Sequence, residues 1–157
     1  MAVCAVLAAG CGEDKHPPKA PPPAYRPPPV QILGVDSYRE AQRALAAGNE
    51  DDALPLLEKS IRANAKLAEA WYELGRLKVK RAPELSKTDE VAGMVMFREG
   101  LEAEREALAL IDGGKAVLWS NEEQLDARAR LDADLENAGD ALSDEDTLRE
   151  ALRMRVH

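Results

Sequence analysis

Histidine and cysteine, two residue types that often carry catalysis or bind metals, are nearly absent from the body of this chain. The two histidines, His16 and His157, lie near the ends of the sequence, and both cysteines, Cys4 and Cys11, lie close to its start. A histidine general base, a thiolate metal site or a disulfide inside a folded body is therefore not expected. We accordingly expect no enzymatic activity, no cofactor and no bound metal.

Aromatic residues are also scarce, at 4%, whereas hydrophobic residues of all kinds make up 45% of the chain and charged residues 32%. A core built mostly from Leu, Ala, Val and Met, beside so many charges, favours packed amphipathic helices over a sheet. The 157 residues suffice for one domain with a core of its own. The formal net charge of −8 argues against nucleic acid and anionic membrane surfaces as partners.

The first twelve residues, MAVCAVLAAGCG, form a short apolar run that ends in small residues and a cysteine. This ending resembles a bacterial lipoprotein signal peptide, in which the cysteine is lipidated and the peptide is cut just before it. The resemblance implies a signal-like segment over 1–10 and a lipid anchor on Cys11. It also implies a place in the bacterial cell envelope, facing the periplasm and preferentially on the outer membrane. A short apolar tail without function is the alternative.

Proline is concentrated directly after this run. Eight of the ten prolines fall within residues 13–29, EDKHPPKAPPPAYRPPP. Proline fixes φ and lacks an N–H, so this composition predicts an extended spacer of roughly 3 Å per residue. We interpret 11–33 as the lipidation cysteine followed by a tether, and a docking motif for a proline-binding partner is the alternative.

Helical patterning begins near Asp36 and continues to the end of the chain. Six helices are expected, over about 36–47, from 50, over 67–81, over 88–112, from 120 and from 143. The first should be capped by Ser37 with Glu40, and the fifth by Ser120 with Glu123. Thr88 should cap the fourth, and the third should end at Ala82-Pro83. The basic cluster that ends at Arg81 would then complement the dipole of the third helix.

Two residue pairs recur after 34 positions, namely Tyr38 with Tyr72 and Ala41 with Gly75. Together with Trp71, Leu74 and Gly75, this spacing resembles the tetratricopeptide repeat, a helix–turn–helix unit. The resemblance implies an all-α domain over 34–157. It would hold about two such repeats over 34–101, closed by a long helix and C-terminal capping helices.

In that family the first helix of each repeat lines a concave groove that binds an extended peptide or a partner's helix. By the resemblance, eight residues would line this groove: Tyr38, Gln42, Leu45, Glu69, Tyr72, Arg76, Val79 and Lys80. Trp71 and Gly75 are expected in the core, because a small residue lets two helices approach and a large one fills the remaining space. Tyr72 is expected in the groove, and the alternative is that it only covers the edge of the core.

These features predict a non-catalytic adaptor or assembly factor of the bacterial envelope whose protein partner is unknown. The runner-up is a soluble helical module that self-associates into a homo-oligomer without a membrane anchor. The third class, an enzyme, would need a carboxylate-only site. Asp132 and Glu136 share a helix face at i,i+4 spacing, but without His or Cys a solvated acidic face is the better interpretation.

Overall fold

The computed structural model describes residues 32–138 and 144–155, and this part of the chain is all-helical. The expected all-α class is confirmed. The helices are α1 (Val35–Ala46), α2 (Glu50–Ala63), α3 (Ala68–Ser86), α4 (Glu90–Asp112), α5 (Asn121–Ala138) and α6 (Glu145–Met154). The signal-like segment 1–10, Cys11, nearly all of the tether and Ser143 lie outside the described residues.

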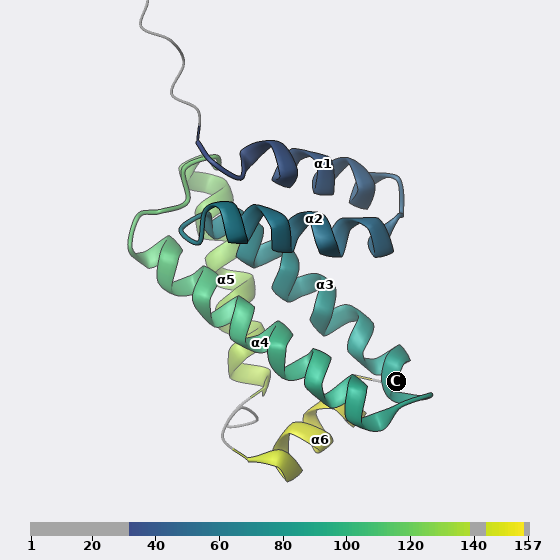
Figure 1. The fold of residues 1–157 in the computed structure, drawn as a ribbon. Helices are drawn as coiled ribbons and strands as arrows, with labels where there is room; N and C mark the ends of the chain where they lie inside the picture. Colours follow the sequence, from purple (N-terminus) through teal and green to yellow (C-terminus); the bar gives the residue numbers. More distant parts are fainter. Residues whose placement is uncertain (1–31, 139–143, 156–157) are drawn as a thin grey trace, which may run out of the picture. The chain divides into compact units, whose positions relative to one another are not determined.

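The helices pack in chain order. Figure 1 shows α1 and α2 side by side, α2 against α3, and the long helices α3 and α4 running along each other. The chain then turns back, so that α5 packs on α4, and α6 contacts α3, α4 and α5. Tyr38, Leu57 and Leu74 belong to the apolar cluster that joins the first three helices. Phe97 and Leu148 belong to a second cluster, which joins α3 and α4 to α6.

Small residues bring α3 and α4 into backbone contact. A β-carbon added to Gly75 would lie 2.7 Å from Cγ of Glu104 and 2.9 Å from its backbone nitrogen. One added to Gly100 would lie 2.8 Å from Cγ2 of Val79. These distances are too short for any larger residue unless the helices move apart. The expected core position of Gly75 is therefore confirmed, and α4 supplies a matching glycine.

The start of α1 differs from the predicted capping box. The helix begins at Val35, directly after Gly34, so Ser37 lies inside it and no side chain caps its first turn. Gly34 has a φ of +83°, and the hydroxyl of Ser60 on α2 donates to its carbonyl at 2.8 Å. A contact between helices thus sets this boundary, and the local sequence does not show it.

The third helix does not end at Ala82-Pro83 as predicted, because α3 continues through Pro83 to Ser86. Proline deprives the carbonyl of Val79, four residues earlier, of its donor. Val79 and Pro83 are both among the residues that line one open pocket. The last turn of α3 is also held by α4, because a β-carbon on Gly93 would lie 2.5 Å from Cβ of Ser86. The basic cluster ending at Arg81 therefore lies inside the helix, away from its C-terminal end.

Caps of the later helices are partly as expected. Asp89, and not Thr88, caps α4 by accepting from the backbone N–H of Ala92 at 3.0 Å. At α5 the expected capping box is confirmed, since Ser120 Oγ accepts from the backbone of Glu123 at 3.3 Å and Glu123 Oε2 accepts from the backbone of Ser120 at 2.7 Å. None of the described helices combines the length and apolarity needed to cross a membrane.

Candidate binding pocket

Residues 113–120, which join α4 to α5 and which we call the strap, cover part of the face predicted to be the groove. The backbone N–H of Leu118 donates to Oε1 of Glu69 at 2.6 Å. The ring of Trp119 meets that of Tyr72 edge to face, with centroids 5.1 Å apart. Glu69 is fully buried and Tyr72 is 5% exposed. These two residues therefore do not line an open groove, because the chain itself occupies their surface.

The predicted groove residues of α1 are divided between core and surface. Tyr38 is buried in the cluster that joins α1, α2 and α3, and Leu45 is half-buried against the same cluster. Gln42 is exposed and its amide donates to the hydroxyl of Tyr38 at 2.8 Å. Burial, together with the carboxylates of Glu73 and Glu69, raises the pKa of the Tyr38 hydroxyl. Tyr38 is thus a core residue, contrary to the prediction that it stands on a groove wall.

The remaining predicted residues, Arg76, Val79 and Lys80, come together in one open pocket of about 310 Å³. Arg76 and Lys80 are exposed, whereas the side chain of Val79 is buried among α3, α4 and α6. The pocket is completed by four residues that were not predicted to line the groove: Pro83, Glu104, Asp134 and Arg155. It therefore draws on α3, α4, α5 and the residue that follows α6.

Glu104 is the unusual member of this pocket. Its side chain has no solvent exposure, and neither carboxylate oxygen has a hydrogen-bond partner within 32–138 and 144–155. Burial, then the neighbouring charge of Asp134, raises the pKa of this carboxyl to about 7, although Arg155 and Arg76 act to lower it. A buried carboxyl without partners is costly, so it marks a position where a partner is missing from the described chain.

The charges around Glu104 are mostly matched among themselves. Lys80 pairs with Glu50, and Arg155 pairs with Asp134 at 3.4 Å. Arg76 makes no ion pair with another described residue, and its guanidinium lies over the ring of Tyr72, 5.3 Å from the centroid. The pocket thus holds one acceptor group, on Glu104, and one donor group, on Arg76, that are unpaired among the described residues.

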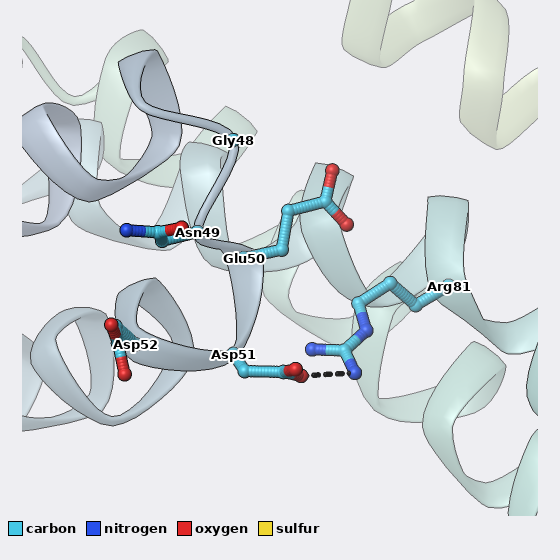
Figure 2. Close-up of a pocket in the computed structure, with 6 residues that line it drawn as sticks. All are labelled: Gly48, Asn49, Glu50, Asp51, Asp52 and Arg81. Carbon is cyan, nitrogen blue, oxygen red and sulfur yellow. Dashed lines mark ion pairs between the residues drawn. The ribbon is translucent and has the colours of Figure 1, made fainter.

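A larger pocket, of about 470 Å³, lies at the turn between α1 and α2. Glu50 and Asp51 pair with basic residues of α3, although Nη1 of Arg81 is buried without a hydrogen-bond partner among the described residues. In Figure 2, Asp51 faces Arg81, at 2.6 Å, while Glu50 and Asp52 point to other sides. Carboxylates in the first turn of α2 complement its dipole. We therefore place the candidate site at Glu104 and not at this turn.

No group of three or more His, Cys, Asp or Glu side chains within the described residues is arranged to hold a metal ion. Asp132, considered above with Glu136, lies 4.0 Å from the guanidinium of Arg128. No family model matches the chain, no curated protein matches it, and no solved structure matches it.

The burial of Glu104 could have been predicted from the periodicity of apolar residues in α4. Buried residues of α4 recur at Phe97, Leu101 and Ile111, and Glu104 falls in the same row between them. A charged residue on an apolar row is either paired or functional, because burial without a partner is unfavourable. The roles of Asp134 and Arg155 had no such signal, since they depend on how α5 and α6 return to the pocket.

Proposed function

We propose that this protein is a non-catalytic adaptor or assembly factor, a tetratricopeptide-type helical module that holds an extended peptide or a helix of a protein partner. The observation that carries this proposal is the Glu104 pocket. Three residues that the family resemblance assigns to the groove, Arg76, Val79 and Lys80, line the same pocket as Glu104, whose buried carboxyl has no hydrogen-bond partner among the described residues. A pocket of about 310 Å³ is at the small end of the range for ligand sites, which suits one short stretch of a partner.

The pairing of helices supports the repeat assignment. α1 packs on α2 and α3 packs on α4, in the order that two successive helix–turn–helix units require. α5 and α6 lie beyond these pairs and cover apolar side chains of α3 and α4, as capping helices would. Under the proposal, the strap and α5 close one part of the concave surface and leave the Glu104 pocket open.

Photo-crosslinking in cells tests the proposed function. A photoreactive residue at Lys80, on the rim of the pocket, should capture a discrete protein partner. Tyr72, which the sequence placed in the groove, is buried and therefore unsuitable as a crosslinking position. The same residue at Lys59, exposed on α2 and away from the pocket, is the matched control. Identical products from both positions, or no product from position 80, would count against a partner at this pocket.

We further propose that Cys11 carries a lipid and that 11–33 tether the helical domain to the bacterial envelope on its periplasmic side, preferentially at the outer membrane. The LAAGC ending and the proline-rich stretch support this. A fatty-acid label should enter the wild-type chain and be absent from Cys11→Ala. A wild-type chain that stays unlabelled in a bacterial host would refute the anchor.

Self-association is the second candidate, and one surface favours it. Val91 and Val95 on α4 are exposed at 71% and 48%, beside a pocket of about 260 Å³ that Arg149 of α6 also lines. Burying two valines against a second copy would be favourable. The mass of the full chain in solution tests self-association. A dimer is expected for the wild type and a monomer for Val91→Lys, and a monomeric wild type would count against self-association.

A further inference from the structure

Two glutamates of the packed helices, Glu69 on α3 and Glu104 on α4, have no solvent exposure, and they differ in what meets them. Glu104 lies opposite Gly75 along the helix pair, because a β-carbon added at Gly75 would lie 2.7 Å from Cγ of Glu104. Gly75 follows Glu69 by six positions on α3, which corresponds to about 9 Å along the helix axis. The two carboxyl groups therefore represent two successive positions along one pair of helices.

The first position shows what kind of group such a carboxyl accepts. Glu69 receives a backbone N–H, that of Leu118, from a segment that is not helical. The segment is held at other points as well, since Trp119 packs on Tyr72 and the side-chain amide of Gln124 on α5 donates to the backbone carbonyls of Ala116 and Trp119. A non-helical stretch of chain thus binds here through its peptide backbone.

The second position has the same kind of acceptor and no donor. Both oxygens of Glu104 are buried and without a hydrogen bond in the described part of the chain, and Glu104 is one of the residues that line an open pocket. Arg76 lines the same pocket and keeps its guanidinium on the ring of Tyr72 instead of pairing with a carboxylate of the described residues. One acceptor group and one donor group therefore belong to the lining of the same pocket.

This combination selects against ligands of a single charge. A cationic ligand would meet Arg76 and Lys80, and an anionic ligand would meet Glu104 and Asp134. A peptide group carries an N–H and a C=O and is neutral overall, so it can satisfy both sides at once.

We propose that the Glu104 pocket binds a backbone peptide group of an extended partner segment, with the segment's N–H donating to Glu104 and its C=O accepting from Arg76. The inference rests on the proposed function and names the chemistry of its site. The partner's backbone N–H donates to Glu104 in the same way that the backbone N–H of Leu118 in the strap donates to Glu69. Side chains of the partner lie against Val79 and Pro83, which form the apolar part of the pocket.

The test uses a displayed library of random twelve-residue peptides, selected on the full chain. The best binder is then resynthesised with each backbone N–H methylated in turn. One N-methyl position should weaken binding by about tenfold or more, the loss expected for a hydrogen bond to a charged group. The same peptide series is measured on Glu104→Leu, which removes the acceptor at similar size, and on Glu102→Gln, an exposed site of α4 that serves as control.

The expected result is a single sensitive position on the wild type and on Glu102→Gln, and no sensitive position on Glu104→Leu. Binders that tolerate every N-methyl group and bind Glu104→Leu as well as wild type would overturn this inference and leave the proposed function standing. A library that yields no binder counts against the proposed function itself, and the inference falls with it.

Discussion

Replacing Glu104 with glutamine should make the free energy of unfolding less dependent on pH. Burial and the charge of Asp134 raise the pKa of this carboxyl in the folded chain from an ordinary 4.5 to about 7. A group that holds its proton more tightly when folded stabilises the fold below its unfolded pKa. That stabilisation is lost as the pH rises through the folded pKa. The interval from 4.5 to about 7 corresponds to about 3 kcal/mol, at about 1.4 kcal/mol per pKa unit.

The assay is urea unfolding followed by helical circular dichroism, at several pH values from about 4 to about 8. Relative to wild type, Glu104→Gln should gain up to about 3 kcal/mol between the lowest and the highest pH. Burial also raises the pKa of Glu73, but this group is present in both proteins and cancels in the difference. Glu102→Gln, exposed on the same helix, should follow the wild-type curve. Parallel curves for wild type and Glu104→Gln would refute the reasoning.

Three further substitutions probe the packing, each by its urea midpoint. Gly100→Ala should destabilise by about 1–2 kcal/mol, because overpacking against Val79 outweighs the gain in helix propensity; a stabilised variant would contradict the close approach. Ser120→Ala should cost about 1 kcal/mol through the lost cap of α5, and no loss would mean that the capping box does not contribute. Trp119→Ala should cost about 2 kcal/mol and alter the aromatic circular dichroism of Tyr72; an unchanged spectrum would place the strap elsewhere.

Elements with strong periodicity were predictable from the sequence. The apolar row of α4 through Phe97 and Leu101 to Ile111, and the inward residues of α6, Leu148 and Leu152, lie where the spacing predicts. The capping box at Ser120 was likewise readable, because both of its partners are local. In each case the information that fixes the structure is contained in a few neighbouring residues.

The predictions that were wrong concern features that depend on contacts between distant parts of the chain. Proline usually ends a helix, yet α3 passes Pro83 because α4 packs on its last turn through Gly93. Tyr72 was expected to be exposed, and Trp71 in the core. Instead Tyr72 is buried under the strap, whereas Trp71 is half-buried and donates its indole N–H to the carbonyl of Ala65 at 2.9 Å. No local pattern shows that a segment more than forty residues later will return to this face.

For the candidate site, the resemblance located three of the seven lining residues. Arg76, Val79 and Lys80 lie on one face of α3 at helical spacing, so placing one of them in the groove also places the other two there. Glu104 was detectable as a charge on an apolar row. Asp134 and Arg155 were not, because α5 and α6 are placed by tertiary packing alone.

The ribosome synthesises Glu69 before it synthesises the strap that covers it. Leu118 follows Glu69 by 49 residues, so a ribosome adding about 5–20 residues per second synthesises it about 2–10 s later. During that interval α1, α2 and α3 can form while the carboxyl of Glu69 still lacks the backbone group that it accepts. A nascent chain stalled after residue 112 should therefore bind extended peptides at a surface that the finished protein covers, and equal binding by the two would contradict this.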